Sequence, residues 1–177
     1  DAFIASGMNY PFRYMVNAVK LNDRGTRFVD AEFTLGVEPR AGGVAQPWFE
    51  LDASGKDKGQ PDAAGATGRV AVWGAKGSRS AAIFDVDGDG DLDIVTNEFN
   101  ASPMVLVSDL SEKTRVHYVQ VKLAGTTSNR DGLGAIVQVT AGGKTYTQAM
   151  DGSSGYLSHS VMPLYFGLGA AESVDRI

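Results

Sequence analysis

The 177-residue sequence has no cysteine and only two histidines. Without cysteine it contains no disulfide framework, no thiolate nucleophile and no cysteine zinc site. His117 and His159 are the only imidazoles, so the sequence does not favour a catalytic zinc held by histidines.

Long apolar runs and an excess of positive charge are also missing. No run approaches the roughly 20 apolar residues that a membrane-spanning helix needs, so we expect no membrane span. The chain has 21 acidic and 16 basic residues, with a formal net charge of −5. This balance disfavours nucleic acid as a partner. With 43% hydrophobic residues, the composition is that of a folded globular protein.

The acidic excess comes from one short segment. Asp85, Asp87, Asp89, Asp91 and Asp93 occupy every second position, and the other 16 acidic residues equal the 16 basic ones. The net charge is therefore a local feature of the chain rather than a property of its whole surface.

Apolar residues alternate with polar ones along much of the chain, and 22 glycines and 6 prolines supply many turns. Alternation with period two is typical of strands that bury one face. Residues 141–144 (AGGK) predict a hairpin turn. Residues 108–114 predict either one helical turn or a linker, and residues 52–68 a polar surface loop. The sequence predicts an all-β fold, with strands near residues 12–21, 69–73, 92–97, 119–123, 135–139, 144–150 and 161–166.

Most aromatic residues lie in these strand-like runs, which favours core positions over a ligand platform. Glu50 and Glu98 are isolated acids, for which an exposed, solvated position is the simplest expectation.

The aspartate-rich segment carries the most specific chemistry. Oxygen donors at positions one, three and five, with glycine at six, are how a loop surrounds Ca²⁺. Asp85, Asp87 and Asp89 would give side-chain oxygens, Asp91 its backbone carbonyl and Asp93 a closing carboxylate. A solvated acidic turn is the alternative, and Mg²⁺ is less favoured because it retains more water. An EF-hand is disfavoured, because its twelfth position would be Thr96 instead of glutamate.

The segment AAIFDVDGDGDLDIVTNE, residues 81–98, resembles the FG-GAP/VCBS repeat of integrin-like β-propellers. The resemblance implies that the loop joins two strands of a blade and that its aspartates bind Ca²⁺. Residues 15–28 resemble the later part of such a blade, although a plain hairpin explains them equally well. About 108 residues cannot close a propeller of at least four blades, so we expect a partial propeller and a longer chain.

Residues 116–177 resemble the ASPIC/UnbV domain, which commonly follows such repeats in secreted proteins. The motifs are SNRDGLGA, AGGK, GSSGYLS and FGLG, in that order. The predicted organisation is a blade-like region over residues 1–108. A small β-sandwich or barrel-like ASPIC/UnbV domain, truncated at its C-terminus, follows over residues 109–177.

A second candidate site is the polar turn formed by Asn129, Arg130 and Asp131. Either Asn129 or Asp131 caps the loop while Arg130 pairs with Asp131 or Asp151, or Arg130 binds a carboxylate or sulfate of a partner. We expect no catalytic residues, because Tyr156 replaces the last glycine that a nucleophile elbow requires.

These observations predict a non-catalytic, calcium-binding interaction or adhesion module. We expect it to be secreted, periplasmic or on the cell surface, with a protein or glycan as its ligand. The alternative is an enzyme or enzyme accessory domain that acts on polysaccharide.

Overall fold

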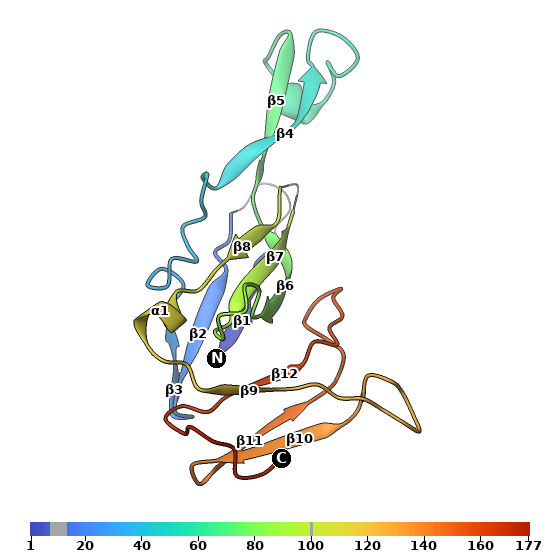
Figure 1. Ribbon diagram of the computed structural model, residues 1–177. Coiled ribbons are helices and arrows are strands. Elements are labelled where there is room, and N and C mark those ends of the chain that lie inside the picture. The colour runs from blue at the N-terminus through green and yellow to red at the C-terminus, as the bar shows by residue number, and fades with distance from the viewer. Residues whose placement is uncertain (8–13, 100) are drawn as a thin grey trace. The chain divides into compact units, whose positions relative to one another are not determined.

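The computed structural model describes residues 1–7, 14–99 and 101–177, and strands dominate it (Figure 1). Within these ranges the helical elements are one 3₁₀ turn, η1 (Pro61–Ala63), and one short helix, α1 (Leu110–Lys113). The strands are β1 (Ala2–Ile4), β2 (Ala18–Asp23), β3 (Arg27–Asp30), β4 (Ala45–Asp52), β5 (Arg69–Ala75), β6 (Ser78–Phe84), β7 (Asp93–Glu98), β8 (Met104–Leu106), β9 (Tyr118–Val121), β10 (Ile136–Ala141), β11 (Lys144–Ala149) and β12 (Leu164–Gly167). The all-β prediction is confirmed.

The chain forms two compact units, and each takes residues from two separate stretches. The first unit contains residues 1–79 and 96–104, and the second contains residues 80–95 and 105–177. The three-stranded sheet β6-β7-β8 contributes residues to both units. The predicted boundary between residues 108 and 109 separates two regions that resemble different families, whereas these units are defined by packing. That boundary stays a prediction.

In the first unit, β1, β2 and β3 form an antiparallel sheet, and β4 pairs with β5. The β2–β3 connection is a tight turn in which Arg24 and Gly25 have positive φ. A small core of Leu51, Ala53, Ala63 and Val72 lies at the loop end of the β4–β5 hairpin.

In the second unit, β9 pairs with β12 and β10 with β11, both antiparallel. One core cluster serves both pairs, because alternate residues of β10 and of β12 face it. This packing of two small sheets is sandwich-like, and the described residues form no closed barrel. The buried members are Val137, Val139, Ala141, Phe166 and Leu168.

Several strand predictions are confirmed, and two are wrong in part. The expected strands at residues 69–73, 92–97 and 144–150 and the hairpin turn at 141–144 match β5, β7, β11 and the β10–β11 turn. The strand expected at 161–166 begins only at Leu164, because Ser160 donates its backbone N–H to Gly152 in a preceding loop. The strand expected at 12–21 begins at Ala18. Residues 12 and 13 lie outside the described part, and Tyr14 and Asn17 donate hydrogen bonds to buried Glu38.

The loop at residues 52–68 was expected to lie on the surface, but two of its residues belong to the hydrophobic core of the β4–β5 hairpin. Its backbone folds back on itself, and Ala53 and Ala63 are buried in the hairpin core. Small apolar side chains can fill such a site without giving a periodic pattern, which is why the sequence did not indicate it.

The expectation that the aromatic residues are mainly core residues is wrong for several of them. Phe166 is buried, but Trp73, Phe49 and Tyr156 are exposed, with Trp73 at 57%. Alternation along a strand shows that one face is apolar, but which faces are covered depends on the layers that pack on them.

No helix in the described ranges combines the length and the apolar character that crossing a membrane would require. This agrees with the absence of long apolar runs in the sequence.

Candidate metal centre

The aspartate loop, residues 85–93, connects the hydrogen-bonded neighbours β6 and β7. Strands flank it on both sides, as the sequence predicted and as an EF-hand would not allow. Gly88 and Gly90 have φ of 83° and 96°, a left-handed region that residues with a Cβ rarely adopt. These two glycines let the loop turn tightly enough to bring its carboxylates together.

Three of the five carboxylates gather at one place. One oxygen each of Asp85, Asp87 and Asp89 lies within 4.8 Å of the other two. Asp85 also accepts hydrogen bonds from the backbone N–H groups of Gly88 (2.7 Å) and Gly90 (3.1 Å). The first, third and fifth positions of the loop therefore point to a common centre, with the side chain of the first fixed by the loop backbone.

Asp91 and Asp93 lie below the surface, and that set of three carboxylates does not include them. Each is only 1% exposed. Asp93 accepts backbone N–H bonds from Val86 (2.7 Å) and Ser108 (2.8 Å), so its carboxylate closes the loop. One oxygen of Asp91, Oδ2, accepts the N–H of Ser111 at 2.7 Å, whereas Oδ1 is buried without a hydrogen-bond partner.

An orphaned, buried carboxylate oxygen is unfavourable, because burial removes the water that would solvate its charge. A hydrogen-bond donor or a cation beside the unpartnered oxygen of Asp91 would therefore be favourable in this loop of five acids. The donor set consists only of hard oxygens, which suits Ca²⁺. The residues present thus fit such an ion.

The surroundings shift the pKa values of the loop residues in opposite directions. Loss of solvation raises the pKa of Asp87, and the negative charges of Asp89, Asp93 and Asp85 raise it further, against a hydrogen bond from the backbone of Asp89 that lowers it. A hydrogen bond from the Ser111 hydroxyl is the main cause that lowers the pKa of Asp89. Repulsion from the neighbouring carboxylates thus adds to the raised pKa of Asp87, and a bound cation would relieve it.

Two tyrosines from β9 and β12 also contact the aspartate loop or each other. The hydroxyl of Tyr165, on β12, donates to the carbonyl of Gly90 at 2.7 Å. The ring of Tyr118, on β9, stacks on the Tyr165 ring with centroids 5.1 Å apart and an interplanar angle of 9°. Burial raises the pKa of Tyr165 to about 12, with added contributions from Tyr118 and from Asp91, Asp85 and Asp89.

These outer contacts could not be predicted from the sequence. The outer residues lie 15 to 75 positions from the loop residues that they contact, and no local pattern links them; they are Ser108, Ser111, Tyr118 and Tyr165. The predicted helical turn at residues 108–114 is present as α1, and its start presents the N–H groups of Ser108 and Ser111 to the loop.

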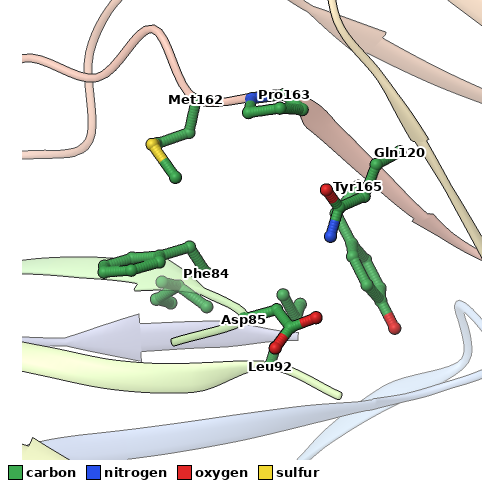
Figure 2. Close-up of a pocket in the computed structure, with 8 residues that line it drawn as sticks. Phe84, Asp85, Leu92, Gln120, Met162, Pro163 and Tyr165 are labelled. Atoms are coloured by element: carbon green, nitrogen blue, oxygen red, sulfur yellow. The ribbon is translucent and has the colours of Figure 1, made fainter. Parts of the chain in front are cut away.

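A small hollow of about 50 Å³ lies beside Asp85 (Figure 2). Met162 and Pro163 lie on one side of it, and Phe84 and Asp85 on the other. A hollow of this volume has room for several water molecules.

The second candidate site, Asn129, Arg130 and Asp131, is an exposed turn. The Asn129 side chain caps the loop, because its Oδ1 accepts from the Leu133 N–H (2.6 Å) and its Nδ2 donates to the Leu133 carbonyl (3.0 Å). Arg130, with its side chain 89% exposed, pairs with Asp131 at 3.2 Å. These contacts agree with the loop-capping alternative, and a recognition role for Arg130 stays a prediction.

The expectation for Glu98 is wrong: it is buried in the first unit instead of being solvated. Its side chain is 1% exposed and pairs at 2.8 Å with Arg40, whose side chain is fully buried. Arg40 also pairs with buried Glu38 at 3.3 Å, and the Ser78 hydroxyl donates to Glu98. The sequence could not indicate this cluster, because its members come from distant segments. Glu50, by contrast, is exposed as expected and pairs with exposed Arg69.

The comparison with protein families concerns the C-terminal part of the chain. Residues 125–177 match the family model described as ASPIC and UnbV. The chain therefore contains an ASPIC/UnbV domain. The resemblance stated for residues 116–177 is confirmed over this range.

The rest of the chain has no such support. No FG-GAP/VCBS repeat is detected in it. No curated protein and no solved structure matches the chain. Strands β10, β11 and β12 lie within the ASPIC/UnbV match, whereas β9 and the aspartate loop precede it.

Proposed function

We propose that this chain is a non-catalytic, extracellular interaction module in which the aspartate loop binds Ca²⁺ as a structural ion. The observation that carries the proposal is the convergence of Asp85, Asp87 and Asp89 in a loop that also contains a buried, unpartnered oxygen of Asp91. The resemblance of residues 81–98 to an FG-GAP/VCBS repeat supports the same ion. The ASPIC/UnbV domain is consistent with an extracellular module.

In this proposal Asp85, Asp87 and Asp89 hold the ion through carboxylate oxygens, while Asp91 and Asp93 complete the site. The ion compensates the repulsion among five acids and fixes the β6–β7 connection. Extracellular calcium modules bind with dissociation constants of about 10⁻⁴–10⁻³ M, which matches millimolar Ca²⁺ outside cells. We propose a secreted, periplasmic or cell-surface location for that reason, and a protein or glycan as the partner.

Calcium should raise the thermal stability of the chain. With a dissociation constant near 10⁻⁴ M, 1 mM Ca²⁺ should stabilise the folded state by about 1.4 kcal/mol. For a chain of this length, that corresponds to a rise in Tm of roughly 3–6 °C. Differential scanning calorimetry of the chain in CaCl₂ and in EDTA measures the shift, and isothermal titration calorimetry with CaCl₂ measures the affinity.

Asp87→Ala should abolish this response, because it removes one of the three converging carboxylates. Asp175→Ala is the matched control: it removes an exposed aspartate of the same unit, so the response should persist. A wild-type melting curve that is identical in CaCl₂ and EDTA, with no heat of binding, would rule out a structural calcium site.

A further inference from the structure

The aspartate loop is held by residues that belong to a different part of the sequence. Gly90 is buried at the tip of the loop, and its carbonyl accepts the hydroxyl of Tyr165 from β12. Tyr118, one strand away on β9, stacks on Tyr165. We call Tyr118 and Tyr165 the tyrosine clamp.

The clamp also packs directly against the loop backbone. A Cβ added at Gly90 would lie 2.5 Å from Cε1 of Tyr118, closer than real contacts allow. Gly88 has a similar positive φ, yet a Cβ there would meet nothing within 4 Å. The clamp therefore needs a glycine at Gly90 for space as well as for backbone conformation.

We propose that the tyrosine clamp is the outer support of the calcium site and couples ion binding to the β9–β12 sheet of the second unit. This inference rests on the proposed function. It adds Tyr118 and Tyr165 to the site and predicts that ion binding stabilises the β9–β12 sheet. Tyr165 holds the Gly90 carbonyl, which fixes the backbone between Asp89 and Asp91. Tyr165 is thus a positioning residue that acts on the carboxylates through the loop.

Ion binding and the Tyr165–Gly90 hydrogen bond are coupled because the five carboxylates of the loop repel one another. Without a cation, five carboxylates drive the loop to open, and opening draws the Gly90 carbonyl away from Tyr165. A cation that closes the loop favours this hydrogen bond and the strand that carries it. By thermodynamic linkage, the bond must favour cation binding by the same factor.

Tyr165→Phe removes the hydroxyl and retains the stacked ring. In isothermal titration calorimetry of the full chain with CaCl₂, the variant should bind about 2- to 10-fold more weakly, the range expected for one hydrogen bond. Tyr146→Phe is the matched control, because Tyr146 packs against the core of the same unit from β11. Its Ca²⁺ affinity should equal that of the wild type.

Hydrogen exchange separates this coupling from a merely structural role of the tyrosine. In the wild type, CaCl₂ in place of EDTA should slow amide exchange in β9 and β12. In Tyr165→Phe this calcium-dependent difference should shrink, whereas a purely structural role would change exchange equally with and without the ion.

A glycine pair provides a second test that leaves both tyrosines and all carboxylates in place. Gly88→Ala and Gly90→Ala impose similar backbone strain, but only Gly90→Ala collides with Tyr118. Gly90→Ala should therefore weaken Ca²⁺ binding more than Gly88→Ala does. Equal weakening by the two would count against the clamp even if Tyr165→Phe failed to fold.

The outcomes distinguish the two proposals. If the wild type gives no heat with CaCl₂, the proposed calcium site itself is wrong. If the wild type binds Ca²⁺ and Tyr165→Phe matches it in affinity and in exchange at β9 and β12, the calcium site stands and the clamp is overturned.

Discussion

Arg40→Ala should lower the free energy of unfolding of the first unit by about 3–5 kcal/mol, the cost of leaving buried charges unpaired. Arg40 lies between the carboxylates of Glu38 and Glu98, and all three side chains are at most 1% exposed. The guanidinium is the only positive charge in this cluster among the described residues. Its removal leaves two negative charges buried without compensation.

The other hydrogen-bond donors described around these two carboxylates are neutral, so they cannot replace the positive charge of Arg40. The backbone N–H of Asn17 donates to Glu38 at 2.8 Å, and the Thr96 hydroxyl donates to Glu98 at 2.7 Å. These neutral donors solvate the carboxylates but do not neutralise them. We therefore expect a loss well beyond that of one ordinary hydrogen bond.

Urea denaturation followed by tryptophan fluorescence is the measurement, because both tryptophans, Trp48 and Trp73, belong to the first unit. Arg69→Ala is the control: it breaks an exposed ion pair with Glu50 and should cost less than about 1 kcal/mol. Adding Glu98→Gln to Arg40→Ala should recover part of the loss, since one uncompensated charge disappears. Equal effects of Arg40→Ala and Arg69→Ala would contradict this account.

Phe166→Ala should destabilise the second unit by about 3–5 kcal/mol, through lost burial and the cavity left behind. Phe166 is 2% exposed and belongs to the core cluster together with Val137 and Val139 of β10. It is also the next residue after Tyr165 on β12, so the same short strand supplies both the core and the tyrosine clamp.

Amide exchange in β10 and β11 measures the effect of Phe166→Ala within the second unit. Tyr156→Ala is the control, because Tyr156 is 63% exposed in a loop of the same unit, and its removal should change stability by no more than about 0.5 kcal/mol. If β10 and β11 keep their protection in Phe166→Ala, then the shared core is not what stabilises the domain.

The two variants also separate the calcium response from the remainder of the fold. Arg40→Ala acts on the first unit and should leave the affinity of the aspartate loop for Ca²⁺ unchanged. Phe166→Ala should weaken that affinity, because it loosens the strand that carries Tyr165.

Local patterns in the sequence determined the fold class and the composition of the candidate site. Period-two alternation and glycine turns are properties of neighbouring residues, so they predicted most strands and the β10–β11 hairpin. The five aspartates and two glycines of the loop also lie within one window of nine residues. Their chemistry could therefore be read directly from the spacing.

Only the tertiary structure decided what surrounds those local elements. It placed Glu98 opposite Arg40, 58 positions away, and Tyr165 on Gly90, 75 positions away. Such partners depend on which strands pair and which faces are covered, and no short pattern encodes either. The sequence determined that the loop suits a cation, and the fold decided that β9 and β12 support it.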